Sequence, residues 1–366
     1  MIEGALAGFT VAVTAERRRN EMAALLERRG ARVISAAAIT IIPLIDDDAL
    51  HAATAACIGL EPHLVIATTG FGFRGWLEAA EGWGLGESLR DVLRNARIIA
   101  RGPKPCGAIR AAGLTEDWAA KTEGSEEVLE RLLAEGVAGL RIVVQEHGEP
   151  QVEFVNALRT AGAAVVEVPV YRWALPPDVA PVRRLVDQVA AGQIDAVTFT
   201  SAPAVKAFLQ IAEEAEADVA AAFACRTLAA CVGPVTAAPL AERGIPFVMP
   251  ERYRLGALIK TVTDELPRRA VRLQVAGTTL EVRGHAVLID DVPHALAPAA
   301  MSILSALARK PGAVVSKDQL AASLPRGNDG HAVDVAVARL RAALGSGKHI
   351  ETVIKRGYRL RIDEVA

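Results

Sequence analysis

Aromatic residues and cysteines are scarce in this chain of 366 residues, and each shortage excludes a class of protein. Phe, Trp and Tyr together make up 4% of the sequence, so the interior must be built mainly from Ala, Val, Leu and Ile. The cysteines form no CxxC pair and have no histidine at metal-ligand spacing, which argues against a disulfide framework and a metal site. We therefore expect ordinary cytoplasmic thiols at Cys57, Cys106, Cys225 and Cys231.

Long apolar runs and targeting signals are also missing. The longest apolar stretch, residues 33–45, is too short to span a bilayer and contains Pro43. The first residues carry neither a basic segment nor a small-residue cleavage site, so we predict no secretory signal and no membrane partner. With 51% apolar and 23% charged residues, the composition is typical of a soluble globular protein, and the length predicts two or three domains.

Charge is distributed unevenly along the chain. From Arg268 onward there are 15 Lys and Arg against 9 Asp and Glu, a net charge of +6. The preceding residues hold 26 against 34, a net charge of −8. A basic tail on an acidic body is typical of proteins whose tail binds a polyanion, although such an excess is also common on ordinary surfaces. Charge alone leaves nucleic-acid binding open.

Three segments of the first 265 residues recur after 131 or 132 residues, which indicates an internal duplication. Residues 8–14 resemble 139–145, residues 64–69 resemble 196–201, and the Gly-Pro turn at 102–103 resembles that at 233–234. Apolar runs alternate with helical periodicity, which predicts parallel strands covered by helices, with ligands beyond the carboxyl ends of the strands. Six runs are expected to be strands buried on both faces: 32–34, 64–67, 98–100, 141–144, 165–168 and 196–199.

Hydroxyl residues and glycines stand where several of these strands should pass into helices. A hydroxyl there can cap the helix, and the free backbone N–H groups of a helix start favour anions. Plain capping explains any one of these positions, but their pairing across the duplication favours a ligand with several carboxylates. The candidate binding residues are Thr68, Thr69, Thr200, Ser201, Gly233, Val235 and Thr236, with Arg101 and Lys104 as added cations.

One motif points to a different ligand. Residues 70–75 spell GxGxxG directly after a predicted strand, which is typical of dinucleotide binding. The motif does not follow the first strand of its unit, its counterpart at 202–204 lacks the glycines, and no acidic residue ends the next strand. A nicotinamide-dependent module is therefore kept only as an alternative. No HExxH, GxSxG or Walker motif occurs, and the isolated His51, His63 and His147 are interpreted as structural.

The segments 197–208 and 230–244, the opening 11–33 and the stretch 166–173 together resemble uroporphyrinogen-III synthase. This enzyme needs no cofactor and cyclises hydroxymethylbilane with inversion of one ring. The resemblance covers about residues 5–265 and implies two pseudo-repeated parallel-sheet α/β lobes with the active cleft between them. It implies crossed connectivity, with lobe 1 from 1–35 and 174–265, lobe 2 from 44–165, and a two-stranded linker from 36–43 and 166–173.

The resemblance also implies roles for single residues. Tyr171 would help the ring hydroxyl to leave, and Thr69, Ser201 and Thr236 would contact acetate and propionate groups. Thr14 is a further candidate ligand-binding residue. Three positions depart from the family pattern: Thr14-Ala15 replaces Thr-Arg, Pro105 replaces a threonine, and Gln145-Glu146 replaces Arg-Gly. Because of these departures, synthase activity is left open while the fold is expected.

The C-terminal hundred residues change to short strands, three helices and a hairpin. Residues 266–269 are expected to be a linker, followed by strands over 271–275, 279–282 and 286–289. A helix is predicted from Pro298, and Ser316 with Gln319 forms a capping box. A further helix over 331–344 has the buried stripe Val333, Val337, Leu340 and Leu344, and a hairpin follows over 350–353 and 358–362 with a basic tip.

The opposite face of the 331–344 helix carries His331, Val335, Ala338 and Arg339. Methyl groups that meet thymine and an arginine that meets guanine suit a major groove, although a loosely patterned amphipathic helix is the alternative. The basic tip suits phosphates or a minor groove.

Residues 314–360 resemble the OmpR/PhoB-type effector domain of response regulators, and the resemblance covers about 270–362. It implies a winged helix-turn-helix domain within 270–366 that binds double-stranded DNA, with 331–344 as recognition helix and Lys355, Arg356 and Arg359 in the wing. A homodimer on paired half-sites is a further expectation. Ala336 and Ala338 replace His or Arg, and Ile354-Lys355 replaces the usual Arg-Gly.

The leading hypothesis is therefore a cytoplasmic transcriptional regulator whose synthase-like module senses a tetrapyrrole precursor or another polycarboxylate. The alternative is a bifunctional protein with active uroporphyrinogen-III synthase.

Overall fold

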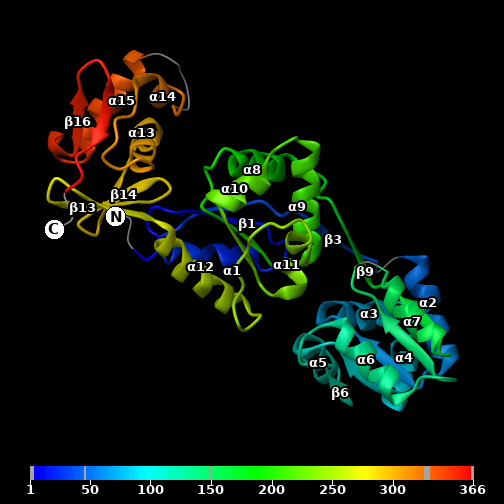
Figure 1. Ribbon diagram of the computed structural model, residues 1–366. Helices are drawn as coiled ribbons and strands as arrows, with labels where there is room; N and C mark the ends of the chain where they lie inside the picture. Colours follow the sequence, from blue (N-terminus) through cyan, green and yellow to red (C-terminus); the bar gives the residue numbers. More distant parts are fainter. Residues whose placement is uncertain (1–3, 45–46, 149, 325–329, 364–366) are drawn as a thin grey trace. The chain divides into compact units, whose positions relative to one another are not determined.

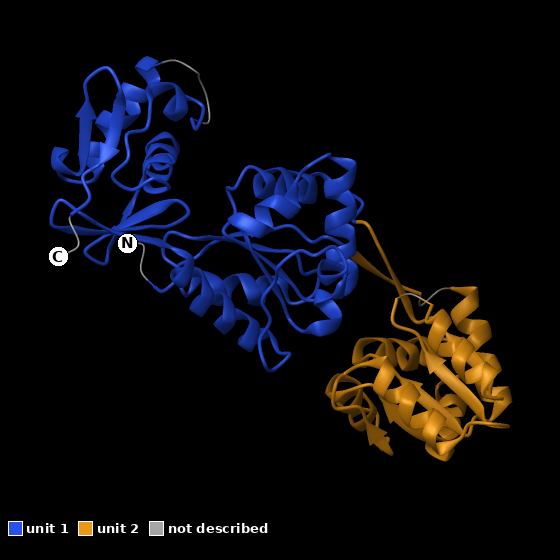
Figure 2. Cartoon of the chain, in the orientation of Figure 1, with its two compact units in different colours: residues 1–39, 176–366 blue, residues 40–175 orange. Residues whose placement is uncertain are grey.

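The computed structural model describes residues 4–44, 47–148, 150–324 and 330–363. The chain folds as two compact units, with residues 1–39 and 176–366 in unit 1 and residues 40–175 in unit 2 (Figure 2). Unit 1 comprises an α/β part (residues 4–39 and 176–269) and a C-terminal domain (residues 271–363) (Figure 1). Ile45, which ends the longest apolar stretch, and residues 364–366 of the predicted C-terminal domain lie outside the described residues.

The α/β part of unit 1 is built on a parallel sheet with strand order β11-β10-β1-β2. Val11 of β1 lies opposite Ala196 of β10 on one side and Val33 of β2 on the other, so the start of the chain completes a sheet formed much later. This is the crossed connectivity that the family resemblance implies. Its elements are β1 (Thr10–Val13), α1 (Arg19–Glu27), β2 (Arg32–Ser35), α8 (Ala180–Ala190), β10 (Ala196–Phe199), α9 (Ala202–Glu214), α10 (Val219–Cys225), β11 (Leu228–Cys231), α11 (Pro234–Ala241) and α12 (Leu255–Arg269).

Unit 2 holds a second parallel sheet, with order β6-β5-β4-β7-β8, and a separate antiparallel pair of β3 and β9. Alternate residues of β4 enter two different cores: Val65 lies in one cluster of buried side chains and Ile66 in the other, because successive side chains of a strand point to opposite faces. Its elements are β3 (Thr40–Pro43), α2 (Asp48–Leu60), β4 (Leu64–Ala67), α3 (Gly70–Gly82), α4 (Gly86–Asn95), β5 (Arg97–Ala100), α5 (Pro103–Ala111), β6 (Trp118–Ala119), α6 (Ser125–Glu135), β7 (Arg141–Gln145), α7 (Val152–Thr160), β8 (Ala164–Val168) and β9 (Tyr171–Ala174).

The expectation that all six apolar runs are buried on both faces is wrong for two of them. β4 and β10 are buried along their whole length, as predicted. The runs 32–34 in β2 and 165–168 in β8 are partly exposed: Arg32 is open to solvent, and residues 33–34 and 165–167 are only half-buried. Both strands lie at the edge of their sheets, where one side has no neighbouring strand and helices cover less of the surface.

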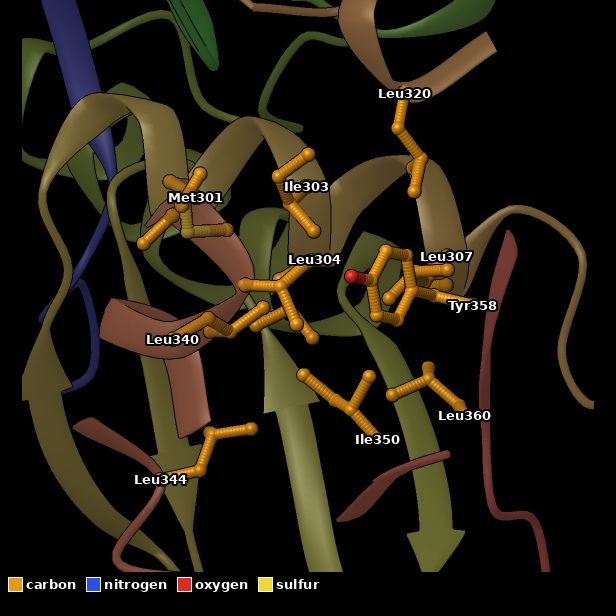
Figure 3. Close-up of a cluster of buried hydrophobic side chains, with 14 of the residues drawn as sticks. Met301, Ile303, Leu304, Leu307, Leu320, Leu340, Leu344, Ile350, Tyr358 and Leu360 are labelled. Carbon is orange, nitrogen blue, oxygen red and sulfur yellow. The ribbon is translucent and has the colours of Figure 1, made fainter. Parts of the chain in front are cut away.

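The C-terminal domain packs three helices and a hairpin against an antiparallel sheet with order β12-β13-β14-β15. Figure 3 shows its core, in which Leu304, Leu340 and Tyr358 come from three different elements. The predicted capping box between Ser316 and Gln319 is present, and β15 is a strand that the sequence analysis missed. The elements are β12 (Val271–Val275), β13 (Thr278–Val282), β14 (Ala286–Ile289), β15 (Val292–Ala295), α13 (Pro298–Ala308), α14 (Lys317–Ala321), α15 (Gly330–Ala343), the 3-10 turn η1 (Gly347–His349), β16 (Ile350–Val353) and β17 (Gly357–Leu360).

Residues 266–269, predicted to be a linker, form the last turn of α12 instead. Leu266 is 2% exposed and packs in the same core as Leu258 and Val262, so burial keeps the helix going through Pro267. Only Ala270 separates α12 from β12. The α/β part therefore runs into the C-terminal domain with almost no intervening chain.

Among the described residues, no helix combines the length and the apolar composition that crossing a membrane requires. The same residues contain no group of three or more His, Cys, Asp and Glu side chains placed to hold a metal ion.

Candidate ligand sites and nucleic-acid interface

The predicted hydroxyl residues between β4 and α3 of unit 2 bind other groups of the protein. Thr69 caps α3 by accepting the backbone N–H of Gly72 at 3.1 Å, as predicted. The buried Thr68 donates its hydroxyl to the backbone carbonyl of Gln145 at 2.7 Å. The Gln145 side chain is fully buried, and its Oε1 accepts the backbone N–H groups of both Thr68 and Thr69 at 3.2 Å. A glutamine from β7 thus occupies the place where an anion was expected.

Packing explains the first two glycines of the GxGxxG motif. A Cβ on Gly70 would lie 2.3 Å from the backbone oxygen of Lys104, and a Cβ on Gly72 would lie 2.4 Å from Nε2 of Gln145. Both glycines therefore let α3 approach its neighbours closely. A Cβ on Gly75 would meet nothing within 4 Å. The motif needs no dinucleotide to account for it.

A cation and a phenol lie near each other in unit 2. Burial lowers the pKa of Arg101, which follows β5, and the nearby Tyr171 and Glu123 oppose this shift. Burial, and secondarily the charge of Arg101, lowers the pKa of His147 to about 3, so this ring is neutral at physiological pH. Tyr171, the first residue of β9, packs edge-on against Phe71 with ring centroids 5.4 Å apart. The predicted site residues Arg101 and Tyr171 are therefore brought together.

Three buried polar atoms of unit 2 have no hydrogen-bond partner among the described residues: His147 Nδ1, Gln151 Nε2 and Trp173 Nε1. The Gln151 Oε1 accepts the Ser125 hydroxyl at 2.9 Å, which leaves the amide nitrogen unused. A Cβ on Gly148 would lie 3.2 Å from the Trp173 ring, so the chain there packs tightly. Buried polar atoms without partners are rare and mark places where water or a ligand completes the bonding.

Sequence reasoning interpreted His147 as structural and missed Gln151 and Trp173. No motif or spacing marks these residues, because they are brought together from the segment after β7, from the start of α7 and from β9. Lys104, predicted to add a cation, is 74% exposed and lies 3.7 Å from Glu123 as an ion pair.

The corresponding strand ends of unit 1 differ from those of unit 2. Ser201 and Gly233 begin α9 and α11, and neither makes a side-chain capping hydrogen bond. Thr14 is buried at the end of β1 and donates its hydroxyl to the backbone oxygen of Thr198 at 2.8 Å. The other predicted residues differ in exposure: Thr200 is half-buried, Val235 is 53% exposed and Thr236 is 5% exposed.

Sequence reasoning also missed Tyr253 in this region. A Cβ on Gly233 would lie 3.0 Å from its ring, so the aromatic side chain packs directly on the turn that begins α11. The glycine allows this contact.

The recognition helix predicted over 331–344 is α15, and its buried stripe is confirmed: Val333, Val337, Leu340 and Leu344 are at most 3% exposed. His331, Val335, Ala338 and Arg339 are exposed, as expected for a reading face. Ala336, compared above with base-contacting residues, is 3% exposed and belongs to the core. It therefore cannot contact bases, because the helix buries a wider arc than the predicted stripe.

Asp334 fixes α15 to its neighbours. Its carboxylate accepts the Tyr358 hydroxyl at 2.6 Å and the Lys317 ammonium at 2.7 Å. The hydrogen bond from Lys317 is the main reason that the pKa of Asp334 is lowered. The reading face is thereby held against both α14 and β17.

The wing is the hairpin of β16 and β17. Its tip exposes Ile354, Lys355 and Arg356, and the isoleucine is 82% exposed. Gly357, predicted at the tip, is buried within β17. Arg359 forms an ion pair with Glu351 at 2.8 Å, which offsets its charge.

The C-terminal domain is fastened to the α/β part of unit 1 by residues 283–285, the turn between β13 and β14. The Arg283 guanidinium donates to the backbone oxygen of Ala7 at 2.7 Å and lies 5.1 Å from the centre of the Phe9 ring. Its side chain is 8% exposed and pairs with Glu281 at 2.7 Å. We call this contact the joint of unit 1.

Two glycines permit the close approach at the joint. A Cβ on Gly8 would lie 2.9 Å from the Cβ of Ala286, and a Cβ on Gly284 would lie 2.0 Å from Oδ2 of Asp195. The backbone N–H of His285 donates to the carbonyl of Gly8 at 2.8 Å. The surfaces therefore fit only because both positions lack a side chain.

Ionisable groups lie inside the joint. Asp195 accepts the backbone N–H of Thr10 at 2.7 Å, and burial raises the pKa of Asp195 to about 7. The His285 Nδ1 lies 3.3 Å from the Thr10 hydroxyl, and burial, followed by the charge of Arg32, lowers the pKa of His285.

Comparisons with known proteins agree with this architecture. The family model described as uroporphyrinogen-III synthase HemD matches residues 20–260, and the model described as transcriptional regulatory protein, C terminal, matches residues 291–360. A crystal structure of a mutant uroporphyrinogen III synthase from Thermus thermophilus is 28% identical and covers 71% of this chain and 100% of that chain, with a TM-score of 0.60.

Two further relatives match different parts. The uncharacterized protein YjjA of Bacillus subtilis is 32% identical over 198 residues, which is 53% of this chain and 73% of YjjA. The RstA DNA-binding domain of Klebsiella pneumoniae, solved in complex with the RstA box, is 28% identical and covers 24% of this chain and 95% of that domain, with a TM-score of 0.21.

Proposed function

Because the chain belongs to the uroporphyrinogen-III synthase family and carries a transcriptional regulatory C-terminal domain, we propose that it is a DNA-binding transcriptional regulator. Its synthase-like module senses a tetrapyrrole precursor or another polycarboxylate. It acts in the cytoplasm, binds double-stranded DNA, and forms a homodimer on paired half-sites.

The joint of unit 1 is the observation that carries this proposal. A ligand controls DNA binding only if it favours one of two states of the protein, and the change must then reach the DNA-binding domain. Arg283 of the C-terminal domain bonds to the α/β part of unit 1, and Gly284 packs closely against it. A single residue separates α12 from β12. The α/β part of unit 1 therefore contacts the C-terminal domain directly, so a change in one can affect the other.

The ligand class follows from the polar groups of unit 2. Arg101 supplies a cation, while Gln151 Nε2 and Trp173 Nε1 are donors without partners among the described residues. Carboxylates are acceptors that bind such groups strongly, because hydrogen bonds to a charged partner exceed those between neutral groups. A molecule with several carboxylates therefore suits this part of the chain best.

The alternative function is a bifunctional protein that also makes uroporphyrinogen III. The electrostatic interaction between Tyr171 and Arg101 supports it, because a phenol can donate a proton to a leaving hydroxyl. Purified protein, hydroxymethylbilane and analysis of the product isomers separate the two functions. Isomer III formed above the spontaneous background and lost in Tyr171→Phe would establish the enzyme. The sensor predicts no such isomer but a ligand-dependent change in DNA affinity.

The DNA half of the proposal is tested with the full chain on a footprinted fragment. Arg339→Ala should lower sequence-specific affinity by ~1–3 kcal/mol, because Arg339 is exposed and a guanidinium can form two hydrogen bonds with a guanine edge. Lys355→Ala should weaken all sequences about equally and flatten the salt dependence. Wild-type binding by both variants would show that the reading surface is wrongly assigned. A melting-temperature shift on adding NAD(H) would instead support the nicotinamide alternative.

A further inference from the structure

We infer that Gln145 is an internal occupant of the anion-binding position before α3, so that unit 2 receives no ligand carboxylate there. This inference rests on the proposed function, because it states which part of unit 2 a polycarboxylate contacts. It makes Gln145 a specificity-determining residue that directs the ligand to the group around Arg101.

The hydrogen bonds define the occupant. Gln145 Oε1 accepts two successive backbone N–H groups, those of Thr68 and Thr69, at 3.2 Å each. Successive N–H groups that converge on one oxygen form the same kind of cradle that binds carboxylate or phosphate oxygens. The amide oxygen is neutral, so it fills the cradle without burying a charge.

The other atoms of Gln145 hold this oxygen in place. Its Nε2 donates to the backbone oxygen of Glu146 and lies 3.4 Å from the Thr69 hydroxyl. The side chain is 0% exposed. Gly72 provides the required space, since a Cβ there would lie 2.4 Å from that Nε2. The orientation of the amide is therefore fixed from both ends.

The duplicated position in unit 1 lacks such an occupant. Thr14, 131 residues before Gln145, has a short side chain whose hydroxyl bonds to the backbone of Thr198. Ser201, the counterpart of Thr69 in the duplication, stands at the start of α9 and has no side-chain capping bond. The occluding side chain is thus a particular feature of unit 2.

The test uses acetate as the probe and the backbone amide resonances of Thr68 and Thr69 in the full-length protein. In the wild type, acetate should leave both resonances unchanged, because Gln145 already accepts these N–H groups. In Gln145→Ala, both should shift and saturate as acetate is added, because the two N–H groups have lost their acceptor. Gln145→Glu keeps an oxygen at the cradle and should again show no shift.

The matched control is Gln151→Ala. It removes another glutamine of unit 2, one whose buried Nε2 has no partner among the described residues, so it should weaken polycarboxylate binding and leave the Thr68 and Thr69 resonances unresponsive to acetate. Equal acetate shifts in wild type and Gln145→Ala would overturn the inference, as would a folded Gln145→Ala protein without any shift.

Hydrogen exchange of the wild type gives a second measurement that needs no variant. If Gln145 holds the Thr68 and Thr69 amides, both should exchange as slowly as the amides of the β4 core. Fast exchange at both positions would refute the occupant even if Gln145→Ala fails to fold. Loss of ligand-controlled DNA binding, with the acetate result intact, would refute the proposed function alone.

Discussion

The C-terminal domain and unit 2 differ in how completely their polar side chains are hydrogen-bonded. In the C-terminal domain, Asp334 has two partners, and Ser316 and Gln319 satisfy each other's backbone N–H groups. In unit 2, four buried side-chain atoms have no partner among the described residues, on Arg131, His147, Gln151 and Trp173. The difference is therefore one of bonding: the named polar groups of the C-terminal domain have partners within the domain, whereas unit 2 buries polar atoms that have none among the described residues.

Titration separates the two regions further. Burial, with the neighbouring Glu167, raises the pKa of Glu146 in unit 2 to about 7, and burial raises that of Asp195 at the joint to the same value. In the C-terminal domain, Asp334 and Glu351 have a lowered pKa because Lys317 and Arg359 bond to them. The two carboxyl groups whose pKa is raised to about 7 therefore lie in the α/β regions, whereas Asp334 and Glu351 of the C-terminal domain are held in the charged form by their cationic partners.

The largest loss of stability is expected from Gly357→Ala, which should destabilise only the C-terminal domain. A Cβ there would lie 2.0 Å from the backbone oxygen of Val315, and the φ of 133° suits only glycine. The domain should lose about 4 kcal/mol or more of unfolding free energy, and DNA binding should disappear. Hydrogen exchange over 271–363 measures the loss.

An internal control accompanies this variant, because all four tryptophans lie in unit 2: Trp76, Trp83, Trp118 and Trp173. Their fluorescence transition should be unchanged in Gly357→Ala. A shift of that transition would show that the two regions do not unfold separately, which would contradict the comparison.

The next largest effect is expected from Asp195→Asn. The folded pKa of about 7 exceeds the ordinary 3.8, so the folded state binds the proton more tightly. The stability from this group is complete below about pH 4 and is lost as pH rises through 7. Asparagine keeps an acceptor for the Thr10 N–H group and does not ionise. The unfolding free energy of the variant should therefore exceed that of the wild type by about 2–4 kcal/mol at pH 8.

Calorimetry between pH 4 and 8 checks this prediction. The difference between variant and wild type should grow with pH, while the slope caused by Glu146 persists in both proteins. Asp264→Asn, at an exposed aspartate paired with Lys260, is the matched control and should show no such trend. Parallel pH curves for Asp195→Asn and the wild type would mean that Asp195 is charged throughout.

The C-terminal domain was the more predictable region because its signals are local. The capping box depends on residues only three positions apart, and the buried stripe of α15 follows from helical spacing, so both were confirmed. Local reasoning failed where packing decides. Pro267 suggested a linker, yet the burial of Leu266 continues the helix, and Ala336, which replaces a His or Arg of the family pattern, is buried in the core.

Only some of the polar residues of unit 2 could be predicted from the sequence. Arg101 and Tyr171 were named from a turn and from a family resemblance. The role of Gln145 depends on contacts with residues 76 and 77 positions away, so no spacing could reveal it. Trp173 and Gln151 stand out only because their burial and missing partners are seen in three dimensions.

A moderate loss of stability is expected from Tyr358→Phe, which removes one of the two hydrogen-bond partners of Asp334 in the C-terminal domain. The change removes the hydroxyl that donates to Asp334 at 2.6 Å but keeps the ring in the core (Figure 3). The domain should lose about 1 kcal/mol, because Lys317 still bonds to the partly exposed carboxylate. Hydrogen exchange of α15 measures the loss, and unchanged exchange would show that the hydroxyl does not anchor the helix.

The smallest effect on stability is expected from Glu351→Gln, which removes the carboxylate that pairs with Arg359 in the C-terminal domain. The Glu351–Arg359 pair is exposed on both sides, so breaking it should leave the unfolding transition nearly unchanged. Arg359 then becomes available to a phosphate, and affinity for all sequences should rise at low salt with a slope steeper by about one. Glu87→Gln, an exposed glutamate of unit 2, is the control and should leave the slope as it is. If Glu351→Gln also leaves the slope unchanged, Arg359 lies outside the DNA interface, and the wing contacts DNA only through its tip.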